Sequence, residues 1–170
     1  YDTRNQAVRS VEELVGLKIQ QGLIGACASG RLEDLRLVSM ILEDKHIANG
    51  FQLFVVPASR DIYLQAVEEG IIDKIAQSGA VVLGSSCGPC LGVGHVASAG
   101  NSRFLSTANS RYIGSANHSG VEKYIASPAT VAMTALRGEL TPMIHFKGSQ
   151  YKYRAKEVEP VVLEMYDYRK

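Results

Sequence analysis

The stretch "GLIGACASGRLEDLRLVSMIL" (residues 22–42) contains two hydrophobic patterns in succession. Its first part, GLIGACA, is apolar without interruption, which is typical of a strand buried on both faces. Its second part starts at Ser29, a candidate helix N-cap. Apolar residues then recur at helical spacing, at Leu32, Leu35, Val38 and Leu42. The stretch therefore predicts a buried strand that ends at Cys27 and a helix that follows it.

The same order of strand and helix recurs along the chain. A second apolar strand at residues 51–58 precedes a helix that Ser59 is expected to cap. The residues of this helix predicted to face the core are Ile62, Ala66 and Val67. Further predicted elements are helices at residues 10–20, 71–79 and 127–138, the last capped by Ser127, and strands at residues 80–84 and 103–109. This alternation predicts an α/β fold, a three-layer αβα domain with a mainly parallel sheet.

The predicted fold brings three thiols to one edge of the sheet. In parallel sheets, functional residues gather at the carboxyl ends of the strands. Cys27 ends the first predicted strand, Cys87 and Cys90 follow the third, and Asn109 ends the fourth. We therefore expect all three thiols of the chain at a single sheet edge, with Asn109 at the same edge.

The composition excludes several classes of function. A formal net charge of +1 over 170 residues, with Lys and Arg spread along the chain, gives no basic surface for nucleic acid or an anionic membrane. No apolar run is long enough to cross a membrane, and the polar N-terminus is not a signal peptide. The three cysteines, an odd and small number, indicate a reducing compartment, so we expect a cytoplasmic protein. Because the chain lacks an initiator methionine, we expect a processed or engineered product or a fragment of something longer.

The chain is predicted to contain one main domain, residues 1–142, and a C-terminal β-rich extension, residues 143–170. After Pro142 apolar and polar residues alternate, and tyrosines pair at strand spacing: Tyr151, Tyr153, Tyr166 and Tyr168. We interpret the extension as two edge strands.

The segment Cys87-Gly-Pro-Cys90 has several possible roles. A thioredoxin-type dithiol opens a long helix and normally follows a Trp, but this chain has no Trp, and residues 91–100 are too rich in glycine for that helix. A zinc site would need four ligands, and His95 could complete three cysteines. The cysteines could also be three unconnected residues of a packed core. The remaining chemistry is an iron–sulfur cluster, where three thiolates would leave one iron without a protein ligand.

Five blocks of the sequence resemble, in order, the cluster-carrying domain of the aconitase superfamily, as in aconitase and the large subunit of 3-isopropylmalate dehydratase. The blocks are residues 18–36, 55–70, 79–94, 106–115 and 124–141. The first resembles a loop usually written G-S-C-T-N-G-R-x-E-D-L, and the fourth falls where the family has S-T-S-N-R-N-F-x-G-R. The resemblance covers roughly residues 11–142 and implies the fold of this cluster-carrying domain.

The resemblance also implies a cofactor and a reaction. By resemblance, Cys27, Cys87 and Cys90 are the three ligands of a [4Fe-4S] cluster, and Asn109 lies beside it. The implied activity is that of a hydro-lyase component, which dehydrates and rehydrates a small hydroxy acid. The closest implied activity is that of the 3-isopropylmalate dehydratase large subunit.

The sequence departs from the family at the positions that hold substrate carboxylates. Ser110 and Ser115 stand where the family has arginines, and Arg111 is one position along from the first of them. Ala28 and Ser29 also replace a usual Thr-Asn pair. Serine has neither the charge nor the bidentate fork of arginine. We therefore expect a substrate with fewer or differently placed carboxylates.

The resemblance implies partners as well. Family members build the active site with further large-subunit domains and a swivel domain or small subunit, which supply the catalytic base. The chain is therefore expected to contain no catalytic base of its own and to be inactive without those parts. Two alternatives are a divergent hydratase of unknown substrate and a non-catalytic iron–sulfur sensor or assembly domain.

Overall fold

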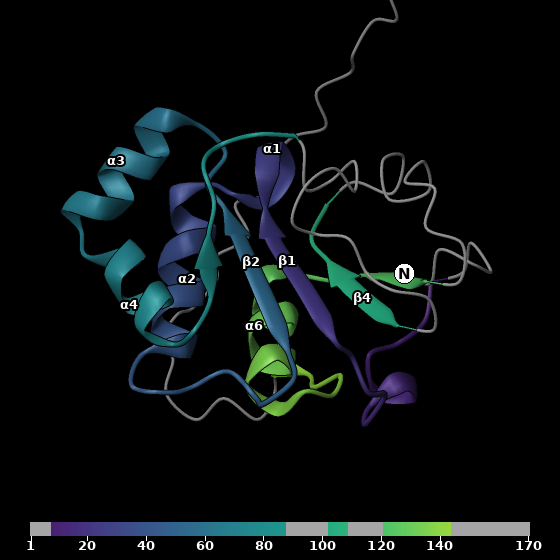
Figure 1. Ribbon diagram of the computed structural model, residues 1–170. Helices are drawn as coiled ribbons and strands as arrows, with labels where there is room; N and C mark the ends of the chain where they lie inside the picture. The colour runs from purple at the N-terminus through teal and green to yellow at the C-terminus, as the bar shows by residue number, and fades with distance from the viewer. Residues whose placement is uncertain (1–7, 88–101, 109–120, 144–170) are drawn as a thin grey trace, which may run out of the picture.

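The computed structural model describes residues 8–87, 102–108 and 121–143, which form one sheet with helices packed against it (Figure 1). The strands are β1 (Gln21–Gly25), β2 (Gln52–Val56), β3 (Val81–Val82), β4 (Arg103–Ser106) and β5 (Glu122–Ile125). They lie in the order β3-β2-β1-β4-β5, and each strand is parallel to its neighbours. The predicted α/β fold with a mainly parallel sheet is confirmed.

Both faces of the sheet are buried. Four helices share the larger core: α2 (Leu32–Leu42), α3 (Arg60–Glu68), α4 (Ile71–Gln77) and α6 (Pro128–Arg137). The buried strand residues in that core are Ile24, Leu53, Val55, Leu105 and Tyr124. Their neighbours along the strands alternate to the other face, where Leu23, Phe54, Val56 and Phe104 form a second cluster with Ala26. No member of this second cluster is more than 7% exposed, as a three-layer arrangement requires.

Two of the serines that are predicted to cap helices do so. Ser59 Oγ accepts a hydrogen bond from the Ile62 N–H at 3.2 Å at the start of α3. Ser127 Oγ accepts one from the Thr130 N–H at 3.3 Å at the start of α6. Each bond satisfies a backbone donor that the first helical turn leaves without a partner. In α2 the residues at helical spacing are buried as expected, namely Leu35, Val38 and Leu42.

The predicted helix at residues 10–20 is wrong. Only a short 3₁₀ turn, η1 (Glu12–Leu14), forms there, and Val15 is 55% exposed. The chain turns at Gly16, which has a φ of +83° and donates its N–H to the Leu140 carbonyl at 3.1 Å. An antiparallel pairing with the residues that follow α6 therefore takes the place of the helix.

Two further details of the prediction around Cys27 are wrong. β1 ends at Gly25, so Cys27 lies in the short helix α1 (Ala26–Ser29) rather than in the strand. Ser29 does not cap α2, because the N-cap residue is Arg31 and no side chain caps this helix. The side chain of Ser29 has another partner, as described below.

Two other elements differ from the prediction. Val67 in α3 is 49% exposed rather than turned toward the core. β5 is not predicted at all, because Glu122 and Lys123 interrupt the apolar pattern that marks the other strands.

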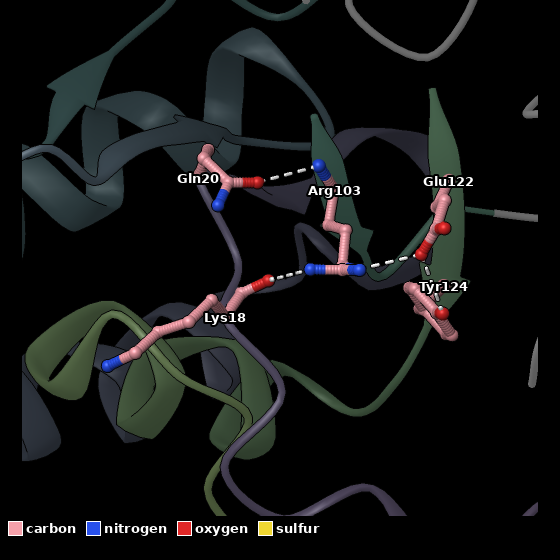
Figure 2. Close-up of polar contacts among 5 residues, drawn as sticks. All are labelled: Lys18, Gln20, Arg103, Glu122 and Tyr124. Atoms are coloured by element: carbon pink, nitrogen blue, oxygen red, sulfur yellow. Dashed lines mark hydrogen bonds and ion pairs between the residues drawn. The ribbon is translucent and has the colours of Figure 1, made fainter. Parts of the chain in front are cut away.

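A polar network joins the starts of β1, β4 and β5 at the amino edge of the sheet (Figure 2). Arg103 Nε lies 2.7 Å from Glu122 Oε2, and Tyr124 Oη donates to the same oxygen at 3.2 Å. The Arg103 backbone N–H donates to Gln20 Oε1 at 2.7 Å, and its guanidinium donates to the Lys18 carbonyl at 3.4 Å. These contacts hold β4 in place beside the start of β1 and beside β5.

The second predicted unit, residues 143–170, lies outside the described residues apart from Met143, so the boundary at residue 142 stays a prediction. Among the residues that the structure describes, no helix has the length and apolar character needed to cross a membrane.

Candidate functional site

The strand order creates a topological switch point between β1 and β4. From β1 the chain continues to β2 and β3 on one side, and then crosses to β4 and β5 on the other. Ligands of open parallel sheets bind outside the carboxyl ends of the strands, where the strand order reverses. The residues at this point are the turn after β1, which contains Cys27, and Thr107 and Ala108 after β4.

Cys27 follows a strained turn. Gly25 has a φ of +112°, and a Cβ at this position would lie 2.0 Å from the Val56 carbonyl oxygen. Ala26 has a φ of +59°, a left-handed conformation that costs a residue with a Cβ about 1–2 kcal/mol. Strain of this kind is concentrated at functional sites. The Cys27 side chain is exposed and forms no disulfide.

The far side of the turn also lies against β2. A Cβ on Gly30 would lie 2.5 Å from the Val56 carbonyl oxygen and 2.7 Å from the Ala58 nitrogen. The Gly30 carbonyl accepts a hydrogen bond from the Ala58 N–H at 2.9 Å. Glycines on both sides of Cys27 therefore allow close packing of the turn on the end of β2. This spacing, G-x-C-x-x-G, is the sequence signal that identifies the turn.

β4 holds the other side of the turn through Thr107, which the sequence analysis does not single out. Thr107 is 6% exposed, and its Oγ1 accepts a hydrogen bond from the Gly25 N–H at 2.9 Å. Its carbonyl accepts one from Ser29 Oγ at 3.3 Å, and its N–H donates to the Leu23 carbonyl at 3.0 Å. The two side-chain bonds join residues 82 and 78 positions apart, so no local sequence pattern could have revealed them.

Cys87 lies at the same edge of the sheet, beyond β2. Leu83 directly follows β3 and donates its N–H to the Val55 carbonyl at 2.9 Å, so the segment that leads to Cys87 begins beside the end of β2. Figure 1 shows the chain that leaves β3 at the same end of the sheet as α1. Cys87 is exposed and forms no disulfide. The structure therefore places two of the predicted thiols, Cys27 and Cys87, at one sheet edge.

The remaining predicted site residues lie outside the described residues: Cys90, His95, Asn109, Ser110, Arg111 and Ser115. Within residues 8–87, 102–108 and 121–143, no three His, Cys, Asp or Glu side chains are grouped as metal ligands. The predicted group of three thiols includes Cys90, which lies outside those residues, so the group stays a prediction.

Charged groups of both signs lie at the carboxyl edge, where three helices begin. Helices α2, α3 and α6 each begin after the carboxyl end of a parallel strand, so their N-terminal ends lie at this edge. Helix N-termini carry partial positive charge and backbone N–H groups without helical partners. Arg31 and Arg60 lie at the starts of α2 and α3, and Arg31 Nε is 3.3 Å from Asp34 Oδ2. Glu33 and Asp34 in the first turn of α2 and Asp61 in that of α3 offset these positive charges.

Cys27 and Cys87 fit the role of ligands better than that of core residues. Cysteines that only pack are among the most buried residues, whereas both of these side chains are exposed. The interpretation as core cysteines is therefore wrong for these two. Thiolates are ligands for zinc and for iron–sulfur clusters. The chemistry of the two described thiols thus agrees with the cofactor that the sequence implies.

A hollow in the described structure lies at the opposite edge, where α2 and α4 end. Three of its charged groups are bonded to neighbours: Lys74 Nζ lies 2.8 Å from Glu43 Oε1, and Lys45 Nζ donates to the Ile41 carbonyl at 2.7 Å. These pairs explain the polar lining as surface contacts between helix ends.

Comparison with known proteins identifies the family of this chain. The sequence profile of the aconitase family (aconitate hydratase) matches residues 2–138. The chain belongs to the aconitase family. This result confirms the resemblance drawn from the five sequence blocks.

Similar members of the aconitase family are large subunits of 3-isopropylmalate dehydratase. The chain is 42% identical to that of Clostridium botulinum (strain Eklund 17B / Type B) over 134 residues, which are 78% of this chain and 32% of that protein. It is 41% identical to that of Hydrogenobaculum sp. (strain Y04AAS1) over 134 residues, 78% of this chain and 31% of that protein. It is 39% identical to large subunit 1 of Methanopyrus kandleri over 132 residues, 77% and 31% of the two chains. The chain thus spans about a third of the length of these relatives.

Proposed function

We propose that this chain is the cluster-bearing part of a hydro-lyase that dehydrates and rehydrates a small hydroxy acid. The proposed activity is of the 3-isopropylmalate dehydratase large-subunit type. The observation that carries the proposal is the pair of free, exposed thiols, Cys27 and Cys87, at the carboxyl edge of the sheet. Membership of the aconitase family and 42% identity to a large subunit support it.

In this proposal Cys27, Cys87 and Cys90 hold a [4Fe-4S] cluster. When bound, such a cluster supplies one iron without a protein ligand, a Lewis acid toward the hydroxyl group of the substrate. The chain itself holds the thiolates in position. The turn between Gly25 and Gly30 presents Cys27. Gly88 and Pro89 are proposed to shape the turn that presents the other two thiolates.

The substrate is proposed to lie against the segment after β4, at Asn109, Ser110, Arg111 and Ser115. Each contact between an arginine and a carboxylate contributes roughly 1.5–3 kcal/mol. Serine at two arginine positions would therefore weaken carboxylate binding by about two to four orders of magnitude, if nothing replaced the charge. The proposed substrate thus has fewer or differently placed carboxylates than citrate or 3-isopropylmalate.

The chain is proposed to act together with other parts of the enzyme. The residues assigned to the site are cluster ligands and substrate contacts, and none of them is a base placed to remove a proton. The base is proposed to come from the remaining large-subunit domains or from a swivel domain or small subunit. Residues 143–170 are proposed to form a separate β-rich extension of the main domain.

A chimera tests this function. The chain replaces the matching segment of the Clostridium botulinum large subunit, and the product is assayed with the small subunit of that enzyme. We expect hydratase activity from the chimera, and none from the isolated chain or from the chimera with Cys27→Ser. Turnover by the isolated, cluster-loaded chain would contradict the proposed division of labour. A chimera that holds the cluster and converts no hydroxy acid would favour a sensor.

The same chimera tests the substrate. The rates on a panel of hydroxy acids are measured for the chimera with and without the changes Ser110→Arg and Ser115→Arg. We expect the serine form to be poor with 3-isopropylmalate, and the double arginine variant to improve it by about two orders of magnitude or more. Normal rates on 3-isopropylmalate with the serines in place would show that another group, such as Arg111, supplies the charge.

A further inference from the structure

We infer that Thr107 is a positioning residue, which sets the place of the Cys27 turn relative to the residues that follow β4. The inference rests on the proposed function, in which Cys27 binds the cluster and Asn109 lies beside it. Thr107 acts through the backbone of the turn, so it is distinct from the proposed ligands and substrate contacts.

The hydrogen bonds of Thr107 depart from a regular sheet. In a parallel ladder, the N–H and C=O of one residue bond to two residues, two positions apart, on the neighbouring strand. The Thr107 N–H follows this pattern and donates to the Leu23 carbonyl at 3.0 Å. The Thr107 carbonyl would then accept the Gly25 N–H. Instead Thr107 Oγ1 accepts that N–H at 2.9 Å, and the carbonyl accepts a hydrogen bond from Ser29 Oγ at 3.3 Å.

A side chain therefore takes the place of the backbone at the last rung between β1 and β4. Because Thr107 Oγ1 lies between the two backbones, the backbone hydrogen bonds between β1 and β4 end here. This position is the switch point, where ligands of such sheets bind. The two bonds attach both ends of the turn, Gly25 and Ser29, to the residue that directly follows β4. Asn109 comes two residues after Thr107 in the chain. The Cys27 turn and the end of β4 thus share one anchor.

The hydroxyl group of Thr107 makes the bond to Gly25, whereas its backbone carbonyl makes the bond to Ser29. The bond to Gly25 is buried, so removal of Oγ1 leaves the Gly25 N–H without an acceptor or allows water to enter. The backbone at Gly25 is then free to move on the β4 side. On the β2 side the close contacts of Gly25 and Gly30 with Val56 remain. Loss of the hydroxyl should therefore shift the turn and its thiol rather than unfold the sheet.

The test compares three variants of the full chain. Thr107→Val keeps the shape of the side chain and removes the hydroxyl, whereas Thr107→Ser keeps the hydroxyl. Thr134→Val is the matched control, because Thr134 is also buried and its Oγ1 accepts a backbone N–H, that of Thr141, at 3.2 Å. Three quantities are measured: hydrogen exchange at the Gly25 amide, alkylation of Cys27 against Cys87 by iodoacetamide without iron, and release of iron from the reconstituted chain to a chelator.

We expect Thr107→Val to speed exchange at the Gly25 amide by roughly one to two orders of magnitude. The alkylation rate of Cys27 should change several-fold while that of Cys87 stays the same, and iron should leave faster. Thr107→Ser should give wild-type values of all three quantities. Thr134→Val should leave the alkylation rate of Cys27 relative to Cys87 unchanged, even if this variant is less stable. Wild-type alkylation of Cys27 in Thr107→Val, or an equal change in Thr134→Val, would overturn the inference. If the wild-type chain binds no cluster, the proposed function fails, but the exchange and alkylation data still decide the role of Thr107.

Discussion

At position 25 the turn before Cys27 leaves room for a hydrogen only. An ideal Cβ on residue 25 would lie only 2.0 Å from the Val56 carbonyl oxygen, and the backbone at this residue has a φ of +112°. Steric overlap and backbone conformation thus require glycine independently. Gly50 meets only the second condition, since its φ is +82° and no atom lies within 4 Å of an added Cβ.

The change Gly25→Ala is therefore expected to destabilise the chain by about 3 kcal/mol or more, because the overlap with backbone adds to conformational strain. Gly50→Ala, which adds strain alone, should cost only about 1–2 kcal/mol. The measurement is the urea midpoint of each iron-free variant, read by circular dichroism. Equal losses for the two variants would show that the contact with Val56 is relieved without cost.

Sequence reasoning identified the thiols but not the residues that hold them. Cys27 and Cys87 could be assigned to one edge because each follows an apolar run that marks a strand. Thr107 and the role of Ser29 could not be predicted, because their partners lie about eighty residues away in the chain. Ser29 had a local explanation as a helix cap, and a contact with β4 took precedence over it.

Helices α2 and α3 are joined on their exposed side by one ion pair. Arg36 donates to both carboxylate oxygens of Glu69, at 2.7 Å and 2.5 Å. The hydrogen bond from Arg36 lowers the pKa of Glu69 below its ordinary value of 4.5, against a smaller opposing effect of desolvation. A carboxyl group with a lowered pKa in the folded state stabilises the fold above its unfolded pKa. That contribution is lost as the pH falls through the folded pKa.

The change Glu69→Gln should therefore lower the free energy of unfolding slightly at neutral pH and have progressively less effect as the pH falls toward about 3, because protonation of Glu69 removes its charge in the wild type as well. The check is a series of urea midpoints between those pH values for wild type, Glu69→Gln and Arg36→Gln/Glu69→Gln. The double variant should show the same pH dependence as the single one. An effect of Glu69→Gln that persists unchanged at low pH would mean that packing, not the ion pair, joins the helices.

Elements with their own local signals were predictable. Ser59 and Ser127 cap α3 and α6 as expected, because the cap bond depends on residues three positions away. The segment at residues 10–20 has a helical apolar pattern, yet pairing with the chain near Leu140 decides its structure. β5 was missed because an edge strand of four residues with Glu122 and Lys123 has no clear pattern.

For the whole molecule, the fold class followed from the alternation of strands and helices, but the strand order did not. The order β3-β2-β1-β4-β5 depends on the crossing from β3 to β4, which no local pattern describes. Contacts such as that between Arg103 and Gln20 fix β4 beside β1 (Figure 2). Because of this order, the Cys27 turn and Thr107 lie side by side at the switch point, where Thr107 bonds to Gly25 and Ser29.

The central claim is that Cys27, Cys87 and Cys90 together bind one iron–sulfur cluster. The most direct test is the content of iron and acid-labile sulfide in the anaerobically reconstituted chain, for wild type and for each of the three Cys→Ser variants. We predict about four irons and four sulfides per wild-type chain, and loss or strong destabilisation of the cluster in every variant. Stoichiometric zinc in place of iron, or a full cluster in all three variants, would contradict the claim.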